Sequence, residues 1–129
     1  MRILVVDDDY VNRKLPAVVL GRVGHAVVEA ATGTDALAIA AREPIDVVLL
    51  DLTMPDMSGY EVCRELRARP GGDALRIIAY TAYGMDGLGG RLGDSGFDAL
   101  LLKPVTPADI LAAIRPPSAD AGDSPPALG

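Results

Sequence analysis

The sequence predicts an α/β domain built on a doubly wound parallel sheet, and two observations carry this prediction. Short runs of Val, Ile and Leu without polar alternation recur along the chain, as at residues 3–6 and 47–50, and such runs are typical of strands buried on both faces of a parallel sheet. Segments with helical periodicity separate the runs, so that strand and helix alternate five times. Repeated βα units require parallel strands joined by right-handed crossovers, with helices on both faces of the sheet.

The elements are expected in a fixed order along the chain. Strands are predicted at residues 2–6, 26–30, 47–50, 76–80 and 99–102, and helices at residues 10–20, 33–42, 58–68, 84–96 and 106–115. Six glycines within residues 84–96 weaken the fourth helix, since each costs roughly 1 kcal/mol relative to Ala. Pro16 lies inside the first helix, where it removes a backbone hydrogen bond unless the helix accommodates it.

Local capping signals mark several helix starts. Ser58 and Glu61 have the spacing of a capping box, in which each side chain bonds the other residue's backbone N–H. Thr106, followed by a proline and by an acid at the third position, has the features of an N-cap. Asp9 is expected to cap the first helix, and Asp56 to be a structural turn residue and not a ligand.

Composition bounds the class of protein. A chain of 129 residues, half of them hydrophobic, is long enough for one domain with a real core. The net charge of −6 argues against direct binding to nucleic acid, and no apolar run approaches the roughly 18 residues that span a bilayer. The single cysteine, Cys63, forms no internal disulfide, which fits a reducing cytoplasm.

We expect residues 1–115 to form the domain, and the Pro-, Ala-, Gly- and Asp-rich residues 116–129 to be a disordered tail.

Charged residues follow three of the predicted strands. Asp7 and Asp8 come after the first, Asp51 after the third and Lys103 after the fifth. Because the carboxyl ends of parallel strands meet at one edge of the sheet, these groups are expected to share a site. Carboxylates hold a divalent cation and a lysine meets an anion, so the pattern indicates phosphoryl chemistry.

Four motifs, in this order and at these separations, resemble the receiver domain of two-component response regulators over residues 2–115. They are Ile-Leu-Val-Val-Asp-Asp at 3–8, Leu-Asp-Leu-Thr-Met-Pro-Asp-Met-Ser-Gly at 50–59, Ala-Tyr-Thr-Ala at 79–82 and Leu-Lys-Pro at 102–104. The resemblance implies a flavodoxin-like (βα)5 fold with strand order 2-1-3-4-5.

The resemblance also assigns the phosphoryl site. By it, Asp51 is the phospho-acceptor, Lys103 pairs with Asp51 at rest and with a phosphate oxygen afterwards, and the Thr81 hydroxyl donates to another oxygen. Mg²⁺ is implied as the cofactor, held by Asp7, Asp8, Asp51 and the backbone carbonyl of Thr53.

Two further expectations follow from the resemblance. A cis bond is expected before Pro104. Thr81 and Leu100 take the positions of the family's switch pair, but Leu100 stands where the family often carries Tyr or Phe and offers no hydroxyl.

The expected function is that of a cytoplasmic receiver. It takes a phosphoryl group from a histidine kinase or a histidine phosphotransfer protein and signals to a downstream protein through changed contacts, with no role for nucleic acid or membrane. The chain is interpreted as a single-domain regulator, with a receiver excised from a larger regulator or hybrid kinase as the alternative. Two rival functions are a binding-only receiver, which usually loses a site residue, and a phosphatase or nucleotide-binding enzyme. Thr53 stands where such phosphatases carry a second acid, and the chain has no phosphate-binding glycine loop, so a metabolic enzyme is not expected.

Overall fold

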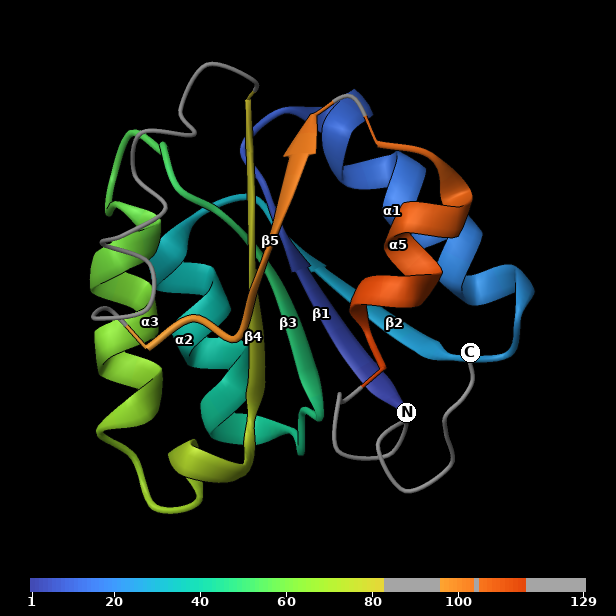
Figure 1. Cartoon of the computed structure of the whole chain (residues 1–129). Helices are drawn as coiled ribbons and strands as arrows, with labels where there is room; N and C mark the ends of the chain where they lie inside the picture. Colours follow the sequence, from blue (N-terminus) through green and yellow to red (C-terminus); the bar gives the residue numbers. More distant parts are fainter. Residues whose placement is uncertain (83–95, 104, 116–129) are drawn as a thin grey trace.

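The computed structural model describes residues 1–82, 96–103 and 105–115 (Figure 1). Its elements, in chain order, are β1 (Arg2–Val6), α1 (Tyr10–Arg22), β2 (Ala26–Ala30), α2 (Gly33–Arg42), β3 (Val47–Asp51), α3 (Gly59–Arg67), the 3₁₀ turn η1 (Gly72–Ala74), β4 (Arg76–Ala82), β5 (Ala99–Lys103) and α5 (Pro107–Ala113). Most of the predicted fourth helix, the predicted cis bond at Pro104 and the predicted tail at 116–129 lie outside the described residues.

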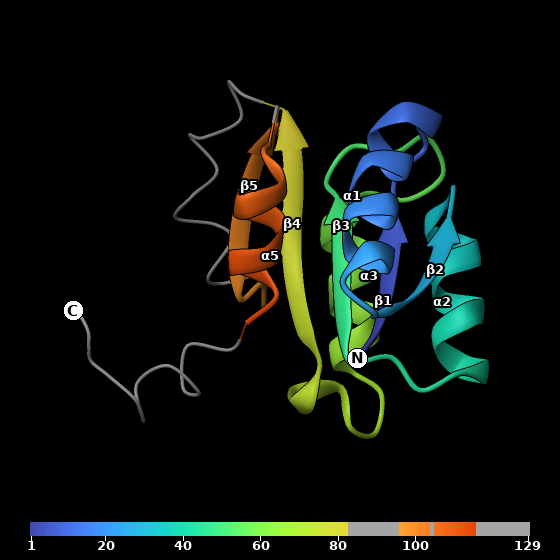
Figure 2. The same ribbon diagram turned by 90° about the vertical axis from the view of Figure 1, so that its right-hand side faces the viewer.

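The five strands form one parallel sheet in the order β2-β1-β3-β4-β5, as predicted (Figure 2). The order reverses direction between β1 and β3, because the chain first moves outward from β1 to β2 and then returns across β1 to β3. At such a switch point the loops after the strands diverge and leave room for a site. The carboxyl ends of β1 and β3 lie side by side there.

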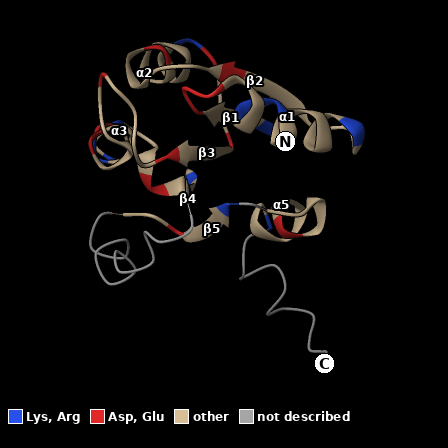
Figure 3. Ribbon diagram, turned by 90° about the horizontal axis from the view of Figure 1, so that it is seen from above, with Lys and Arg blue, Asp and Glu red and all other residues tan. Residues whose placement is uncertain are grey.

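Helices cover both faces of the sheet, with α1 and α5 on one side and α2 and α3 on the other (Figure 3). Alternate residues of each strand contribute to opposite cores, since successive strand side chains point to opposite faces. In β3, for example, Val47 and Leu49 pack in the α1/α5 core, whereas Val48 and Leu50 pack in the α2/α3 core. All four are at most 2% exposed, so the runs without polar alternation are explained by burial on both faces.

Three strands run slightly further than predicted. β3 includes Asp51, β4 continues through Thr81 to Ala82, and β5 includes Lys103. These side chains are therefore fixed by sheet hydrogen bonding and do not lie in the loops beyond the strands. The shift of one or two residues is the usual uncertainty of an element boundary, but it matters because strand residues hold their positions more rigidly than loop residues.

The helix starts follow the predicted caps. The Ser58–Glu61 capping box is present at α3, and a second box pairs Thr106 with Asp109 at α5. Asp9 caps α1 by accepting from the backbone N–H of Asn12. The first helix does not break at Pro16 but continues to Arg22. The proline is buried, and its burial offsets part of the lost hydrogen bond.

The start of β5 is tied to the end of α3 through Arg67. Its guanidinium donates to the Gly96 carbonyl and to the Asp98 carboxylate, and the same Asp98 oxygen accepts from the backbone N–H of Ile77 at 2.9 Å. These bonds hold β5 beside β4, so the strand that carries Lys103 enters the sheet in a defined position.

Candidate phosphoryl and metal site

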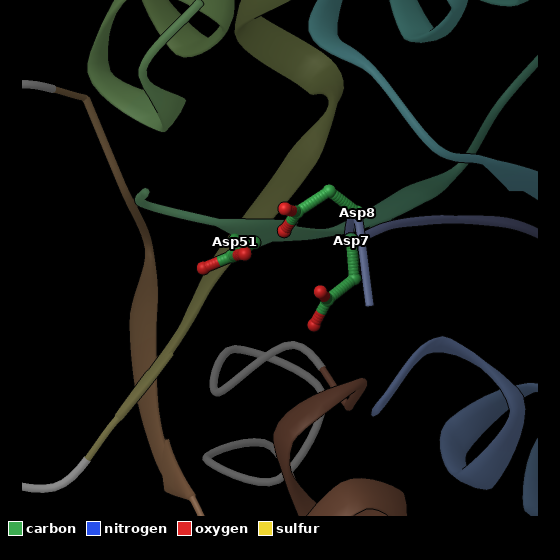
Figure 4. A group of neighbouring side chains, drawn as sticks. All are labelled: Asp7, Asp8 and Asp51. Carbon is green, nitrogen blue, oxygen red and sulfur yellow. The ribbon is translucent and has the colours of Figure 1, made fainter. Parts of the chain in front are cut away.

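Three carboxylates gather at the carboxyl edge of the sheet (Figure 4). Asp7 and Asp8 follow β1, Asp51 ends β3, and one oxygen of each lies within 4.8 Å of the others. Asp7 and Asp51 are buried, at 0% and 3% exposed, whereas Asp8 is exposed. The structure thus brings together the three acids that the sequence predicted would meet, with one side of the cluster open to solvent.

Backbone groups fix the two buried acids. The Asp7 carboxylate accepts from the N–H of Asp9 at 2.9 Å, and the Asp51 carboxylate accepts from the N–H of Thr53 at 3.2 Å. The guanidinium of Arg13 donates to the Asp7 carbonyl at 2.9 Å while its Nε pairs with Glu29. Arg13 was not recognised from the sequence as part of this region, because its contacts, to the residue after β1 and to β2, follow no local sequence pattern.

Lys103 lies between the two buried acids and is closer to Asp7 than to Asp51. Its Nζ is 2.9 Å from Asp7 Oδ2 and 3.9 Å from Asp51 Oδ1. The predicted resting ion pair with Asp51 is present, and the shorter, hydrogen-bonded contact is made to Asp7. The physical reason is that Asp7 is fully buried and needs a hydrogen-bonded counter-charge. Lys103 remains within ion-pair distance of Asp51 and can reach both carboxylates.

The carboxyl group of Asp51 has a raised pKa. Burial and then the neighbouring Asp7 carboxylate raise the pKa of Asp51 to about 6, against the opposing effects of Lys103 and the Thr53 N–H. Near pH 7 the Asp51 carboxylate is ionised, and this charge lowers the stability of the folded state. A cation bound beside Asp51, or a group transferred to it, would relieve this unfavourable charge.

Thr81 places a hydroxyl at the same edge without a partner. The side chain is 1% exposed, and Oγ1 has no hydrogen-bond partner among the described residues. An unsatisfied buried hydroxyl is unfavourable, so this atom suits a ligand oxygen that arrives from outside. The structure places Leu100 on β5, opposite Ala79 of β4 and partly buried against the α2/α3 core.

The donor set fits a hard divalent cation. Carboxylate oxygens are the ligands that Mg²⁺ prefers, and the open side at Asp8 leaves space for the water molecules that Mg²⁺ retains. Burial and then the Asp7 carboxylate raise the pKa of Asp51 by more than Lys103 and the Thr53 N–H lower it, so a cation at this cluster would stabilise the ionised carboxylate. Thr53 lies in the exposed loop directly after Asp51, at the position from which the predicted backbone ligand would come.

The loop after Asp51 is anchored to α2 by Asp56. Its carboxylate accepts from the backbone N–H groups of Gly33 and Thr34 at 3.1 and 3.0 Å, and from the Thr34 hydroxyl at 2.9 Å. The N–H groups of Thr34 and then Gly33 lower the pKa of Asp56 to about 2. The sequence predicted a structural role for Asp56 but not this partner, since no local pattern connects residue 56 to a helix 22 residues earlier.

We expect Asp56→Ala to destabilise the protein more than Asp73→Ala. The first change removes three hydrogen bonds at the positive end of α2. Asp73 is an exposed aspartate in η1. Thermal unfolding near neutral pH measures the difference as a melting temperature several degrees lower for Asp56→Ala. Equal melting temperatures would show that the Asp56 contacts contribute nothing.

The fold and the site together define an α/β domain with three clustered carboxylates and a lysine at a topological switch point. The sequence model of the response regulator receiver domain matches residues 3–115, and the chain belongs to that family.

Curated relatives are similar over most of this chain. It is 42% identical to the sensor histidine kinase RcsC of Escherichia coli (strain K12) over 106 residues, which is 82% of this chain and 11% of RcsC. It is 39% identical to the response regulator PleD of Caulobacter vibrioides over 116 residues, covering 88% of this chain and 25% of PleD. The chain therefore spans a quarter or less of the length of these relatives.

Solved structures show the same fold. A receiver domain protein from Methanospirillum hungatei is 34% identical with a TM-score of 0.78, over 88% of this chain and 89% of that one. The receiver domain of the sensor histidine kinase PA1611 from Pseudomonas aeruginosa is 32% identical with a TM-score of 0.79, over 88% and 93% of the two chains. That structure has a magnesium ion coordinated in its active-site cleft.

Proposed function

We propose that Asp51 accepts a phosphoryl group from the phosphohistidine of a histidine kinase or a histidine phosphotransfer protein. A carboxylate oxygen of Asp51 attacks the phosphorus, an O–P bond forms, and the P–N bond breaks with its electron pair returning to the imidazole. The chain is a receiver and not a metabolic enzyme. The observation that carries the assignment is the position of Asp51 between a second buried acid, an open acid and a lysine at one sheet edge.

Each neighbour of Asp51 has a role in this transfer. Asp8 and Asp51, with Asp7 directly or through water and with the backbone carbonyl of Thr53, would hold Mg²⁺. The cation supplies positive charge that offsets the repulsion between a carboxylate nucleophile and the phosphoryl oxygens. Lys103, already 3.9 Å from Asp51, would pair with one phosphoryl oxygen.

Signalling would follow from a change at Thr81. Its unpartnered buried hydroxyl would donate to a phosphoryl oxygen of phosphorylated Asp51 and thereby move toward the site. The Leu100 side chain, on the neighbouring strand, would then move into the space that Thr81 vacates. The altered surface would bind a downstream protein. The net charge of −6 favours a protein target over nucleic acid.

The partners would meet the chain in the cytoplasm. No helix within the described ranges is long and apolar enough to cross a membrane. A receiver excised from a larger regulator or hybrid kinase accepts phosphoryl groups by the same site and remains the alternative setting. A binding-only receiver is disfavoured, because Asp51, the acid pair, Thr81 and Lys103 are all in place.

Acetyl phosphate tests the function without a cognate donor. The protein is incubated with acetyl phosphate and Mg²⁺ and its intact mass is followed, with EDTA as the control. We expect a gain of one phosphoryl group that requires Mg²⁺. A mass that stays unchanged, or a gain that persists unaltered in EDTA, would contradict the proposal.

The phosphoryl donor is expected to dock on α1. Val11, Leu15 and Val18 lie on one stripe of this helix and are 71%, 42% and 48% exposed. The helix begins directly after Asp9, so the stripe starts beside the acidic cluster. An exposed apolar stripe next to the reacting carboxylate is a suitable surface for a partner that must bring its phosphohistidine to Asp51.

Leu15→Asn should separate docking from chemistry. We expect transfer from a protein donor to slow by roughly tenfold, as for an apolar contact at the centre of an interface, whereas phosphorylation by acetyl phosphate is unchanged. Val23→Asn is the matched control, since Val23 is 53% exposed but lies beyond the other end of α1. Donor-dependent rates that are equal in both variants would place docking elsewhere.

A further inference from the structure

Lys103 has a third neighbour that the phosphoryl chemistry does not use. Its Nζ lies 4.7 Å from the centre of the Tyr80 ring, within the range of a cation–π contact. Tyr80 is 2% exposed and belongs to the core between the sheet and α1/α5. The Lys103 side chain is 16% exposed, so the ammonium is largely removed from water and depends on its protein neighbours.

Strand register explains why these two residues meet. Tyr80 of β4 is paired with Leu101 of β5 and with Asp51 of β3. Tyr80 and Leu101 both pack in the α1/α5 core, and Lys103 follows Leu101 by two residues on the same face of β5. The ring and the ammonium are therefore diagonal neighbours on one face, beside the carboxylate that reacts.

A neutral ring suits this position better than another acidic side chain would. Burial, and then the nearby carboxylates of Asp7 and Asp51, raise the pKa of Tyr80 to about 12, so the phenol keeps its proton. The ring face attracts the ammonium through its quadrupole without adding to the negative charge around Asp51. It also offers no lone pair at that face that would compete with a phosphoryl oxygen for the Lys103 N–H groups.

We propose that Tyr80 is a positioning residue that holds the Lys103 ammonium beside Asp7 and Asp51 and keeps it there when its pairing changes. In the resting state the ammonium bonds Asp7 at 2.9 Å and lies 3.9 Å from Asp51. During transfer it must shift from Asp7 toward a phosphoryl oxygen, and the ring remains in contact through that short movement. The inference rests on the proposed role of Asp51 as acceptor.

Nuclear magnetic resonance of the two lysines tests the contact itself. The chain has only Lys14 and Lys103, so lysine-selective labelling gives two sets of side-chain signals, assigned with Lys14→Arg. Ring currents shift protons above an aromatic face upfield, and we expect this for the Lys103 ε-methylene in wild type and Tyr80→Phe but not in Tyr80→Leu. A wild-type Lys103 signal at the ordinary position would overturn the proposal.

Phosphorylation rates test the consequence. With acetyl phosphate and saturating Mg²⁺, we expect Tyr80→Phe to match wild type and Tyr80→Leu to slow about fivefold, the scale of one partly buried cation–π contact. Ile78→Ala is the control for lost core packing, because Ile78 is buried in the same core two residues earlier on β4 and carries no ring. It should retain the wild-type rate.

The outcomes separate the two claims. A Tyr80→Leu rate equal to wild type, or an Ile78→Ala rate reduced by the same factor, would refute positioning by the ring. Failure of wild type itself to gain a phosphoryl group would refute the proposed function, while the lysine spectrum would still decide whether the ring contacts Lys103. If Tyr80→Leu does not fold, Tyr80→Met removes the ring with less change in shape, and its rate is judged in the same way.

Discussion

Asp51→Asn is expected to leave a folded protein that accepts no phosphoryl group. The substitution keeps the shape of the side chain and removes the nucleophilic carboxylate, and the neighbouring acids do not replace it. Asp7 is fully buried and bonded to Lys103, whereas Asp8 is exposed to solvent. Intact mass after acetyl phosphate and Mg²⁺ measures the loss. A mass gain equal to that of wild type would refute the assignment of Asp51.

The same variant should be more stable than wild type when metal is absent. The pKa of Asp51 is raised from 3.8 to about 6, so the fold disfavours its charged form by up to about 3 kcal/mol above the higher value. We expect Asp51→Asn to unfold with a free energy larger by about 2 kcal/mol near pH 7 in EDTA, since the loss of the Thr53 hydrogen bond offsets part of the gain.

The pH dependence of that difference has a defined sign. A carboxyl with a raised pKa contributes no penalty below its unfolded pKa, because both states are then protonated. The penalty grows as the pH rises from about 4 to about 6 and is complete above that window. Chemical denaturation of both proteins across this range should show the advantage of Asp51→Asn shrinking toward zero at the acidic end. An advantage independent of pH would show that charge is not its cause.

Replacement of Asp8 should have the second large effect, which is a loss of metal binding. We expect millimolar Mg²⁺ to raise the melting temperature of wild type, because the cation binds only the folded cluster and relieves the repulsion among its carboxylates. Asp8→Ala removes the one open acid and should abolish most of this shift. Asp9→Ala is a suitable control, since Asp9 adjoins the cluster but its side chain caps α1.

Two results would contradict the metal assignment. A wild-type melting temperature that ignores Mg²⁺ would mean that the cluster does not bind the ion. An Asp8→Ala shift as large as that of wild type would mean that the ion binds elsewhere. A smaller overall stability of Asp9→Ala with a normal Mg²⁺ shift is expected, because capping and metal binding are independent.

The features that the sequence predicted well depend on local or periodic signals. Burial on both faces of the sheet follows from the unbroken apolar runs of β1 and β3, and the capping boxes at Ser58 and Thr106 follow from fixed short spacings. The meeting of Asp7, Asp8 and Asp51 follows from topology alone, because parallel strands deliver their carboxyl ends to one edge.

The features that the sequence missed depend on distances between elements. Whether Lys103 bonds Asp7 or Asp51 is decided by about an ångström at the end of β5. The Asp56 contact to α2 and the Tyr80 contact to Lys103 join segments that no short spacing links. The sequence contains one signal for the contact between Tyr80 and Lys103, because both occupy strand positions whose side chains point to the α1/α5 face of the sheet. The register between β4 and β5 was still needed to show that the two side chains are neighbours.

The central claim is that the phosphoryl group is carried by Asp51, and the most direct measurement locates the modified residue. Protein phosphorylated by acetyl phosphate and Mg²⁺ is reduced with borohydride, which converts an aspartyl phosphate to homoserine, and is then digested for peptide mass mapping. We predict homoserine at position 51 and unmodified aspartate at Asp7 and Asp8. Homoserine at Asp7 or Asp8, or phosphate retained on another residue with Asp51 unmodified, would contradict the account.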